Sequence, residues 1–256
     1  MRLRQVALMA HKIAPVALAL EEVFGLKIAF RDPAVAVFGL ANVVMPVGGE
    51  FIEVLEPVRD DASGARYLAR RGGDAGYMVI LQDADALGHR TRLEAAGVRA
   101  VARNRGEGRY RFTHFHPADC AGVLLSIDSV EGDSGWAEPL SDWPPAGTGW
   151  RASESAGTLG LTAVAIQHRD PFGAAERWAK LLDLPLAHDG ETFEINLGGE
   201  AIRFVPPIDA DGTGVVGLDL VVSDVDAVLA RARAIGLNCD DGAVPIGGVA
   251  IRPLPG

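Results

Sequence analysis

An internal repeat constrains this chain more than any single motif does. Residues 76–97 (GYMVILQDADALGHRTRLEAAG) read as a short apolar strand, an Asp-x-Asp turn and a helix that ends at glycine, and residues 217–236 (GLDLVVSDVDAVLARARAIG) read in the same way. Identical residues recur 141 positions apart (83 + 141 = 224): Asp83, Asp85, Ala86, Arg90 and Arg92 match Asp224, Asp226, Ala227, Arg231 and Arg233. Because repetition at a fixed spacing indicates a duplicated structural unit, the chain is predicted to be built from copies of one scaffold.

The two halves of the chain are also related, at a spacing of 158 positions (6 + 158 = 164). Val6, Ala7 and Leu8 recur as Val164, Ala165 and Ile166, and Phe24 and Leu26 recur as Leu182 and Leu184. Four units therefore follow one another, and each begins with a strand and a helix. Each helix has one apolar face that only a sheet can cover. The predicted class is α+β, with helices on the outside of the sheets.

Apolar runs and glycine-bearing turns give the expected elements. In the first unit we expect a strand at 3–9, a helix from Pro15 to Gly25, strands at 34–38, 41–46 and 50–55, and then a polar connector at 59–74. In the second unit the strand and helix of the repeat precede strands at 98–102, 110–115 and 122–128. The third unit begins near residue 159, with strands at 192–197 and 200–205, and the fourth spans 217–254. The third unit is expected to lack about one strand.

These units predict two domains, residues 1–130 (modules 1–57 and 72–130) and a trimmed domain at 158–256. The linker between them, residues 131–157, is rich in Gly, Pro and Ser and carries Trp136, Trp143 and Trp150 at a spacing of seven. Pro144 and Pro145 exclude a continuous helix there. We expect an ordered linker whose tryptophans pack against the domains, with a ligand lid as the alternative.

Composition narrows the partners. The formal charge of −10 over 256 residues argues against a nucleic-acid partner, because phosphate binding needs clustered Lys and Arg. Cys120 and Cys239 form neither a disulfide framework nor a zinc spacing, so both are expected to be buried in a reduced, cytoplasmic protein.

His11 and Lys12 interrupt the apolar segment at the start of the chain, and no apolar run reaches the roughly 18–20 residues that a bilayer span needs. No membrane partner is expected.

Five stretches carry a resemblance to a known family: LRQVALM at the start, VFGLKI after the first helix, FIEVLEP, the strand–Asp-x-Asp–helix stretch and HPADCAGVLLSID. With its units in this order, the chain resembles the vicinal oxygen chelate superfamily, which includes glyoxalase I, methylmalonyl-CoA epimerase, extradiol dioxygenases and bleomycin-resistance proteins. The resemblance implies paired βαβββ modules that curl into two cup-shaped, glyoxalase-like domains. Because this fold hosts many chemistries, activity has to be argued from the residues of the cups.

The resemblance also implies where metal-using members hold a divalent ion. In the first domain those places fall on Gln5, Glu53, Gly76 (or Tyr77, one residue on) and Ser126. In the second domain they fall on Ala163, Arg203, Gly217 and Arg252. A divalent ion takes about four to six N or O donors with negative charge among them. We therefore predict no metal in the second cup and no cofactor in either, with a divalent metal at Glu53 as the alternative for the first cup.

Two histidines reopen the question of chemistry. His114 and His116 lie two residues apart on a predicted strand, so they are expected to face one side together with Tyr110 and Phe112. On the cup side they would bind a metal with Gln5 and Glu53, bind an anionic substrate or move protons. The alternative is that they are surface or hydrogen-bonded strand residues.

Three further positions have two interpretations each. Glu53 is either a residue of the cup or an exposed residue on the outer face. Arg203 and Arg252 either pair with Asp219 or Glu200, or hold a carboxylate substrate. The residues expected to contact a ligand are Gln5, Tyr77, Phe112 and Ser126.

Three hypotheses for function follow. The first is a protein that binds a small organic molecule in a cup that has lost the usual metal ligands. The second is an enzyme, a lyase or isomerase of the glyoxalase or epimerase type or a dioxygenase-type enzyme, acting on a small oxo or hydroxy acid or a thioester. In it, Glu53 would be the general base, and His114 or His116 would be the second proton carrier. The third is a structural role as a homodimer joined through sheet edges.

Overall fold

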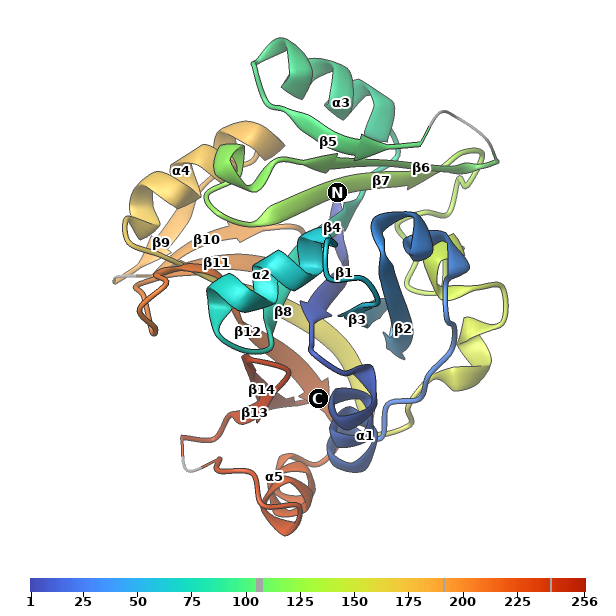
Figure 1. Ribbon diagram of the computed structural model, residues 1–256, viewed down its shortest axis with the longest axis vertical. Coiled ribbons are helices and arrows are strands. Elements are labelled where there is room, and N and C mark those ends of the chain that lie inside the picture. The colour runs from blue at the N-terminus through green and yellow to red at the C-terminus, as the bar shows by residue number, and fades with distance from the viewer. Residues whose placement is uncertain (105–107, 191, 240) are drawn as a thin grey trace.

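The computed structural model describes residues 1–104, 108–190, 192–239 and 241–256. Over these residues the chain forms two mixed sheets of seven strands each (Figure 1). The strand orders are β2-β3-β1-β4-β7-β6-β5 and β13-β14-β12-β8-β11-β10-β9. At the centre of each sheet the opening strands of two units pair antiparallel, β1 with β4 and β8 with β12. The predicted α+β class and the pairing of modules within each domain are confirmed.

The amino-terminal domain contains the first sheet. Its strands are β1 (Arg2–Met9), β2 (Leu40–Val47), β3 (Glu50–Pro57), β4 (Ala75–Gln82), β5 (Ala100–Arg103), β6 (Tyr110–Phe115) and β7 (Leu124–Val130). Its helices are α1 (Ile13–Phe24), α2 (Ser63–Arg71) and α3 (Ala86–Ala95), and short 3₁₀ turns lie at Pro33–Phe38 and Pro117–Asp119.

The carboxyl-terminal domain contains the second sheet. Its strands are β8 (Thr158–His168), β9 (Ala187–Asp189), β10 (Thr192–Asn196), β11 (Ala201–Val205), β12 (Thr213–Val222), β13 (Val244–Ile246) and β14 (Val249–Pro255). Its helices are α4 (Pro171–Leu182) and α5 (Val225–Ala234), and the linker contains 3₁₀ turns at Pro144–Ala146 and Trp150–Ser153.

The structure confirms one of the two repeat spacings and corrects the other. The spacing of 158 is confirmed, because α1 and α4 correspond end to end (13 + 158 = 171; 24 + 158 = 182). The spacing of 141 is wrong by two, because α3 and α5 correspond at 139 (86 + 139 = 225; 95 + 139 = 234). Asp85 and Asp224 are the matching residues, since each caps its helix by accepting a hydrogen bond from the backbone N–H three residues on. An Asp-x-Asp pair aligns equally well two residues out of register, and only the cap decides between the two.

Three local expectations are corrected. The strand predicted at 34–38 is the 3₁₀ turn Pro33–Phe38, where Asp32 caps the N–H of Ala34. The connector predicted at 59–74 contains α2, which buries Leu68 and ends at Gly72 in a left-handed conformation. The third unit is not short, because β9 supplies its third strand. The shorter units are the first and the fourth, which have two strands after the helix.

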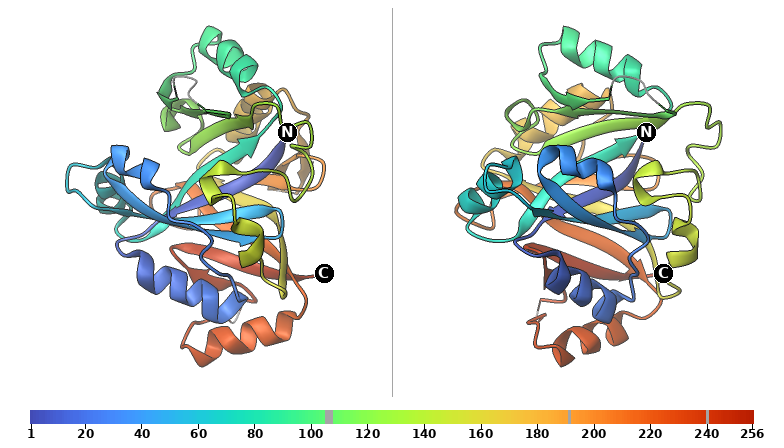
Figure 2. Two further views of the ribbon diagram at one scale, coloured as in Figure 1. Left: turned by 90° about the vertical axis from the view of Figure 1, so that its right-hand side faces the viewer. Right: turned by 45° about the vertical axis from the view of Figure 1, so that its right-hand side comes forward.

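The two sheets share one core. On β1 and β3 of the first sheet, Val6, Leu8 and Val54 belong to the same buried cluster as Val164 and Leu218 of the second sheet. We call this side of each sheet its packing face and the opposite side its cup face. Helices complete the shared core in pairs, and Figure 2 shows α1 beside α5 at one end. The Arg231 guanidinium of α5 donates to the Val23 carbonyl of α1, and Arg92 of α3 donates to the Leu181 carbonyl of α4. The two cups therefore face away from a common centre.

Close backbone contact joins the domains. A Cβ at Gly76 would lie 2.6 Å from the Val215 side chain, and one at Gly248 would lie 1.8 Å from the Asp74 carbonyl oxygen. Cys120 and Cys239 are buried and free, as predicted. Within the described residues, none of the helices has the length and apolarity that crossing a bilayer requires.

Candidate functional site

Glu53 lies on the cup face of the first sheet, on β3 between Ala7 of β1 and Val44 of β2. Its side chain is buried, and both carboxylate oxygens accept amide hydrogen bonds. Oε2 accepts from Gln5 Nε2 at 2.8 Å, and Oε1 accepts from Asn42 Nδ2 at 2.5 Å. These neutral partners only partly offset the loss of water, so burial raises the pKa of Glu53 to about 7. At neutral pH this carboxyl group is close to half protonated.

The linker fills the place next to Gln5. The indole Nε1 of Trp143 donates to Gln5 Oε1 at 2.7 Å, and the ring stacks on Phe51 at 6.4 Å and meets the edge of Tyr110 at 5.6 Å. Trp143 is 1% exposed. Arg4 holds this part of the linker by donating to the Ser141 carbonyl, and its guanidinium lies 5.3 Å from the Trp143 ring. The chain itself therefore occupies this part of the first cup.

A second carboxyl group lies on the same cup face, on β7. Asp128 is fully buried and accepts hydrogen bonds from the hydroxyls of Tyr110 and Ser126. Burial raises the pKa of Asp128 to about 7, although the hydrogen bonds from the two hydroxyls lower it in part. The first cup thus contains two carboxyl groups that exchange protons near neutral pH, each held by neutral donors.

His114 belongs to this cup face, as one of the two sequence interpretations predicted. It pairs with Ser126 across β6 and β7, and its ring lies 4.7 Å from Phe112 and 5.9 Å from Phe38. Its apolar surroundings lower the pKa of His114 to about 4. The imidazole is therefore neutral over the physiological range, so it is a weak base there and does not bind an anion through charge.

His116 does not join His114. Strand β6 ends at Phe115, and His116 begins the turn Pro117–Asp119, where its Nδ1 accepts from the Ala118 N–H at 3.1 Å. The same Nδ1 lies 3.3 Å from Nη2 of Arg99. The expectation that both histidines face one side required the strand to continue for one more residue. Pro117, which cannot extend the ladder, follows directly.

The strand register moves the ligand place that was expected at Gly76 or Tyr77 to another residue of β4. Ala7 lies beside Glu53 and Ile80 lies beside Ser126, so the residue of β4 that corresponds to Gln5 is Met78. A bulge between Ala7 and Leu8 shifts the register here. Tyr77 instead packs its ring on Tyr67 of α2, at 5.0 Å.

The second cup is different, because its face lines a cavity of about 910 Å³. The floor is made of small residues from three adjacent strands, Ala165, Gly217 and Ala250. Apolar side chains line part of the wall, among them Val205, Val216 and Leu254. The polar part of the wall consists of His188, Thr192, Glu194, Arg203, Asp219, Asp241 and Arg252.

Charges in this cavity are unevenly paired. The Arg203 guanidinium lies between two carboxylates, with Nε donating to Glu194 at 3.0 Å and Nη1 donating to Asp219. Arg252 approaches Asp219 only at 3.9 Å, and its side chain is 62% exposed. Of the two interpretations, pairing with Asp219 or Glu200 is confirmed for Arg203 and Asp219, with Glu194 in the place of Glu200. The alternative, that an arginine holds a carboxylate substrate, stays open for Arg252. Arg252 therefore keeps most of its hydrogen-bond donors for a ligand.

Comparisons with known proteins can now be set beside this geometry. The sequence matches no family model, and it matches none of the curated proteins. Among solved structures, a variant of 4-hydroxymandelate synthase from Streptomyces coelicolor aligns over 99% of this chain and 92% of its own, at 18% identity and a TM-score of 0.68. This chain has the vicinal oxygen chelate fold, in tandem-domain form.

Two further solved structures align with about half of this chain. Methylmalonyl-CoA epimerase from Mycobacterium tuberculosis covers 50% of this chain and 87% of its own, at 21% identity and a TM-score of 0.45. A variant of the Streptomyces coelicolor epimerase covers 51% and 97%, at 22% identity and a TM-score of 0.46. At these identities the vicinal oxygen chelate likeness concerns the fold, and the activity has to be argued from the cups.

The metal site that the sequence resemblance implies does not fit the first cup. Glu53 has both oxygens engaged by amide N–H groups, and Gln5 turns its nitrogen toward Glu53 and its oxygen toward Trp143. The other two places carry a thioether, at Met78, and a hydroxyl, at Ser126, which donates to Asp128. Within the described residues, no three His, Cys, Asp or Glu side chains come together as a metal site would need. The metal-free state remains a prediction.

Several residues of the two vicinal oxygen chelate cups were missed from the sequence. Asp128 had a signal, because it lies two residues after Ser126 on one strand and so shares its face. Asn42 and Glu194 had none, since each is placed by a strand register that local sequence does not encode. Trp143 was expected to pack against a domain, which is confirmed, but its place beside Gln5 comes from a chain crossing.

Proposed function

We propose that this protein binds a small organic acid in its carboxyl-terminal cup without a metal ion. The observation that supports the proposal is Arg252, a guanidinium with unused donors on the wall of a cavity of about 910 Å³. A guanidinium offers a carboxylate two parallel hydrogen bonds. The wall carboxylates Glu194 and Asp219 contact Arg203, and the third, Asp241, is exposed. The summed charge of the wall is not positive, so it is the open hydrogen-bond donors of Arg252 that favour an anion.

The apolar body of the acid would lie on the small and aliphatic residues of the cup. Small residues at Ala165, Gly217 and Ala250 leave room above the sheet, and Val205, Val216 and Leu254 offer aliphatic contact. Sites of this kind, mostly apolar with a few placed polar groups, are typical of small-molecule binding. A compact acid with one flat or branched apolar group suits this lining.

The test is binding of a fluorescent anion and its neutral analogue. The anion is 1-anilinonaphthalene-8-sulfonate, and the analogue is N-phenyl-1-naphthylamine, which lacks the sulfonate. Wild-type protein should bind the sulfonate more tightly, and Arg252→Ala should weaken sulfonate binding by about tenfold or more while leaving the neutral analogue unchanged. Arg233→Ala is the matched control, because it removes an exposed arginine of α5 outside the cavity. Equal sulfonate binding by the Arg252→Ala and Arg233→Ala variants would refute the proposal.

A second candidate function is proton transfer in the first cup, favoured by the pKa of Glu53 near 7. The carboxylate form of Glu53 would take a proton from the carbon beside a carbonyl of an oxo or hydroxy acid or a thioester, and neutral His114 would be the second carrier. Turnover of such compounds should vanish in Glu53→Gln and persist in His116→Ala. Turnover that survives Glu53→Gln unchanged would exclude this role for the first cup.

A further inference from the structure

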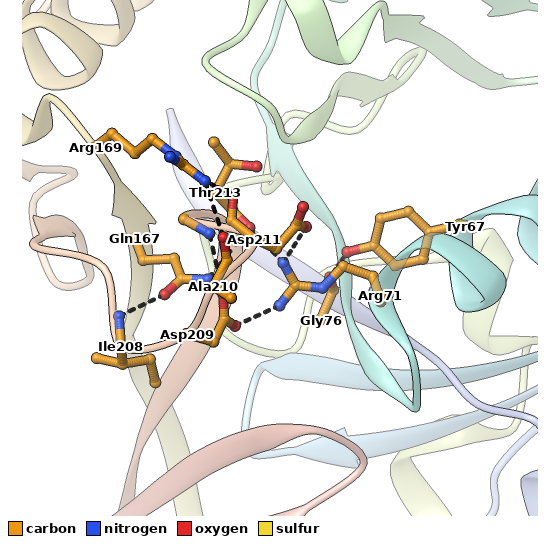
Figure 3. A network of polar contacts seen from close by, with 11 residues as sticks. Tyr67, Arg71, Gly76, Gln167, Arg169, Ile208, Asp209, Ala210, Asp211 and Thr213 are labelled. Carbon is orange, nitrogen blue, oxygen red and sulfur yellow. Dashed lines mark hydrogen bonds and ion pairs between the residues drawn. The ribbon is translucent and has the colours of Figure 1, made fainter.

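The loop between β11 and β12, residues 206–212, forms one rim of the second cup; we call it the rim loop. Ile208 of this loop lines the cavity. Its side chain is 69% exposed, so burial of its own apolar residues does not fix the loop. Its position is set by polar contacts, which Figure 3 shows together.

The charged contact to the rim loop comes from the other domain. Arg71, the last residue of α2, reaches Asp209 with Nη2 at 2.8 Å, and with Nη1 it reaches Asp211 and the Thr213 carbonyl, the latter at 2.7 Å (Figure 3). The Arg71 side chain is only 6% exposed. A buried guanidinium that bridges two carboxylates and a carbonyl has one well-defined geometry. Arg71 therefore fixes three points of the chain at and beside the rim loop.

Most contacts from within the carboxyl-terminal domain reach the backbone of the rim loop, and the Asp209 carboxylate accepts from the Gly212 N–H at 3.1 Å. The Ile208 N–H donates to Gln167 Oε1 at 2.8 Å, and Arg169 donates to the Ala210 carbonyl at 2.9 Å. They hold the backbone at single points and leave the carboxylates of Asp209 and Asp211 unneutralised. Without Arg71, these two acids, two residues apart, would repel each other with no cation between them.

The other side of α2 belongs to the first cup. Leu68 is part of the apolar cluster over the first cup face, and the Tyr67 ring packs on Tyr77. The Tyr67 hydroxyl also donates to the Gly76 carbonyl at the start of β4 (Figure 3). The helix that carries Arg71 is thus anchored to the amino-terminal domain along its length, and Arg71 transmits that anchor to the rim of the second cup.

We propose that Arg71 is a positioning residue for the carboxyl-terminal cup. It holds the rim loop in the form that encloses a ligand, so that binding in the second domain depends on a side chain of the first. The proposal rests on the proposed function for its ligand and goes beyond it by assigning control of that site to the neighbouring domain.

The experiment compares Arg71→Ala with Arg70→Ala, which removes an exposed arginine from the same turn of α2. Hydrogen exchange followed by mass spectrometry reports on residues 206–213, and fluorescence of 1-anilinonaphthalene-8-sulfonate reports on the cup. Arg71→Ala should raise exchange of this segment and weaken sulfonate binding by about three- to tenfold, while Arg70→Ala behaves like wild type. Arg71→Lys should be intermediate, because an ammonium cannot bridge both carboxylates in one plane.

A second variant, on the other side of the contact, shows whether the effects of Arg71→Ala come from the lost ion pairs or from damage to α2. Asp209→Asn with Asp211→Asn removes the same ion pairs and leaves α2 intact, so it should reproduce the exchange and binding changes. Adding Arg71→Ala to that background should add little.

The outcomes separate the two proposals. Unchanged exchange in Arg71→Ala would overturn the positioning role, and raised exchange with unchanged sulfonate affinity would show that the rim loop does not govern the cup. Failure of the proposed function has another mark: Arg252→Ala would bind the sulfonate as wild type does. In that case exchange at residues 206–213 alone still decides whether Arg71 positions the rim loop.

Discussion

The two cups start from the same strand register and reach opposite chemistry. Glu53 and Arg203 hold equivalent places, since each lies beside the same position of its opening strand, Ala7 and Ala165 (7 + 158 = 165). The Glu53 carboxyl group is buried and accepts hydrogen bonds from two side-chain amides. Arg203 instead lies between two carboxylates at the edge of a cavity. Duplication therefore preserved the backbone and left each cup free to change its lining.

What closes the first cup is a segment that the second cup lacks. The linker lays Trp143 and Trp150 over Phe51, and both indoles are about 1% exposed. Nothing comparable in the described residues covers Ala165, Gly217 and Ala250. A carboxyl group under such a cover is pushed toward its neutral form, whereas a guanidinium at an open wall stays charged and available.

The largest effect is expected from removing Trp143, which would open the first cup and so remove its difference from the second. Trp143→Ala deletes a fully buried indole and its bond to Gln5, so the free energy of unfolding should fall by about 3–5 kcal/mol. Urea denaturation measures the loss. The matched control is Trp136→Ala, at a half-buried indole of the same linker, which should cost much less. Equal losses for the two variants would mean that Trp143 does not hold the first cup closed.

Glu53→Gln should change the pH dependence of stability. The pKa of Glu53 is about 7 in the folded chain and near 4.5 when unfolded, so the folded state binds the extra proton. Stability from this group is complete below about pH 4.5 and is lost as pH rises through 7. At pH 8 wild type should be less stable than Glu53→Gln by up to about 3 kcal/mol, at 1.36 kcal/mol per pKa unit, and at pH 4.5 the two should agree.

Thermal unfolding from pH 4.5 to pH 8 provides the measurement. A constant difference between wild type and Glu53→Gln across this range would show that Glu53 does not take up its proton on folding. Asp128 has the same raised pKa, so wild type and Glu53→Gln should both retain the Asp128 contribution.

Glu194→Gln should strengthen the preference of the second cup for an anion. It removes one of the two carboxylates that neutralise Arg203 and keeps the side-chain shape. The cup becomes more positive, and binding of 1-anilinonaphthalene-8-sulfonate should tighten about threefold. The neutral analogue N-phenyl-1-naphthylamine provides the control. Weaker sulfonate binding would indicate that Glu194 itself contacts the probe.

The smallest effect is expected at His114. Its apolar surroundings lower its pKa to about 4, so its NMR signals should stay unchanged from pH 8 to about pH 5 and shift only below that. The His114→Gln variant assigns the signals. A midpoint near 6.5 would place the imidazole in water and remove it from the first cup.

Local sequence was a good guide to elements and faces. The apolar runs predicted β1 and β6 closely, and alternation along strands placed His114 with Phe112 and Tyr110. It failed where an apolar stretch was short, as at Pro33–Phe38, and where one apolar stripe was diluted by polar residues, as in α2. In both places tertiary packing decided the conformation over a weak local preference.

The sequence by itself determined the duplicated scaffold, because strand and helix periodicities are local and recur at fixed spacing. The resemblance that the sequence carries implied that Gln5, Glu53 and Ser126 lie in one cup, while the exposed alternative for Glu53 stayed open until its hydrogen bonds were seen. Only the tertiary structure decided that Trp143, 138 residues from Gln5, would fill that cup, and that Arg71 would reach across to Asp209. Such contacts depend on how separate segments cross in space, and no periodicity within one segment records the partner it will meet.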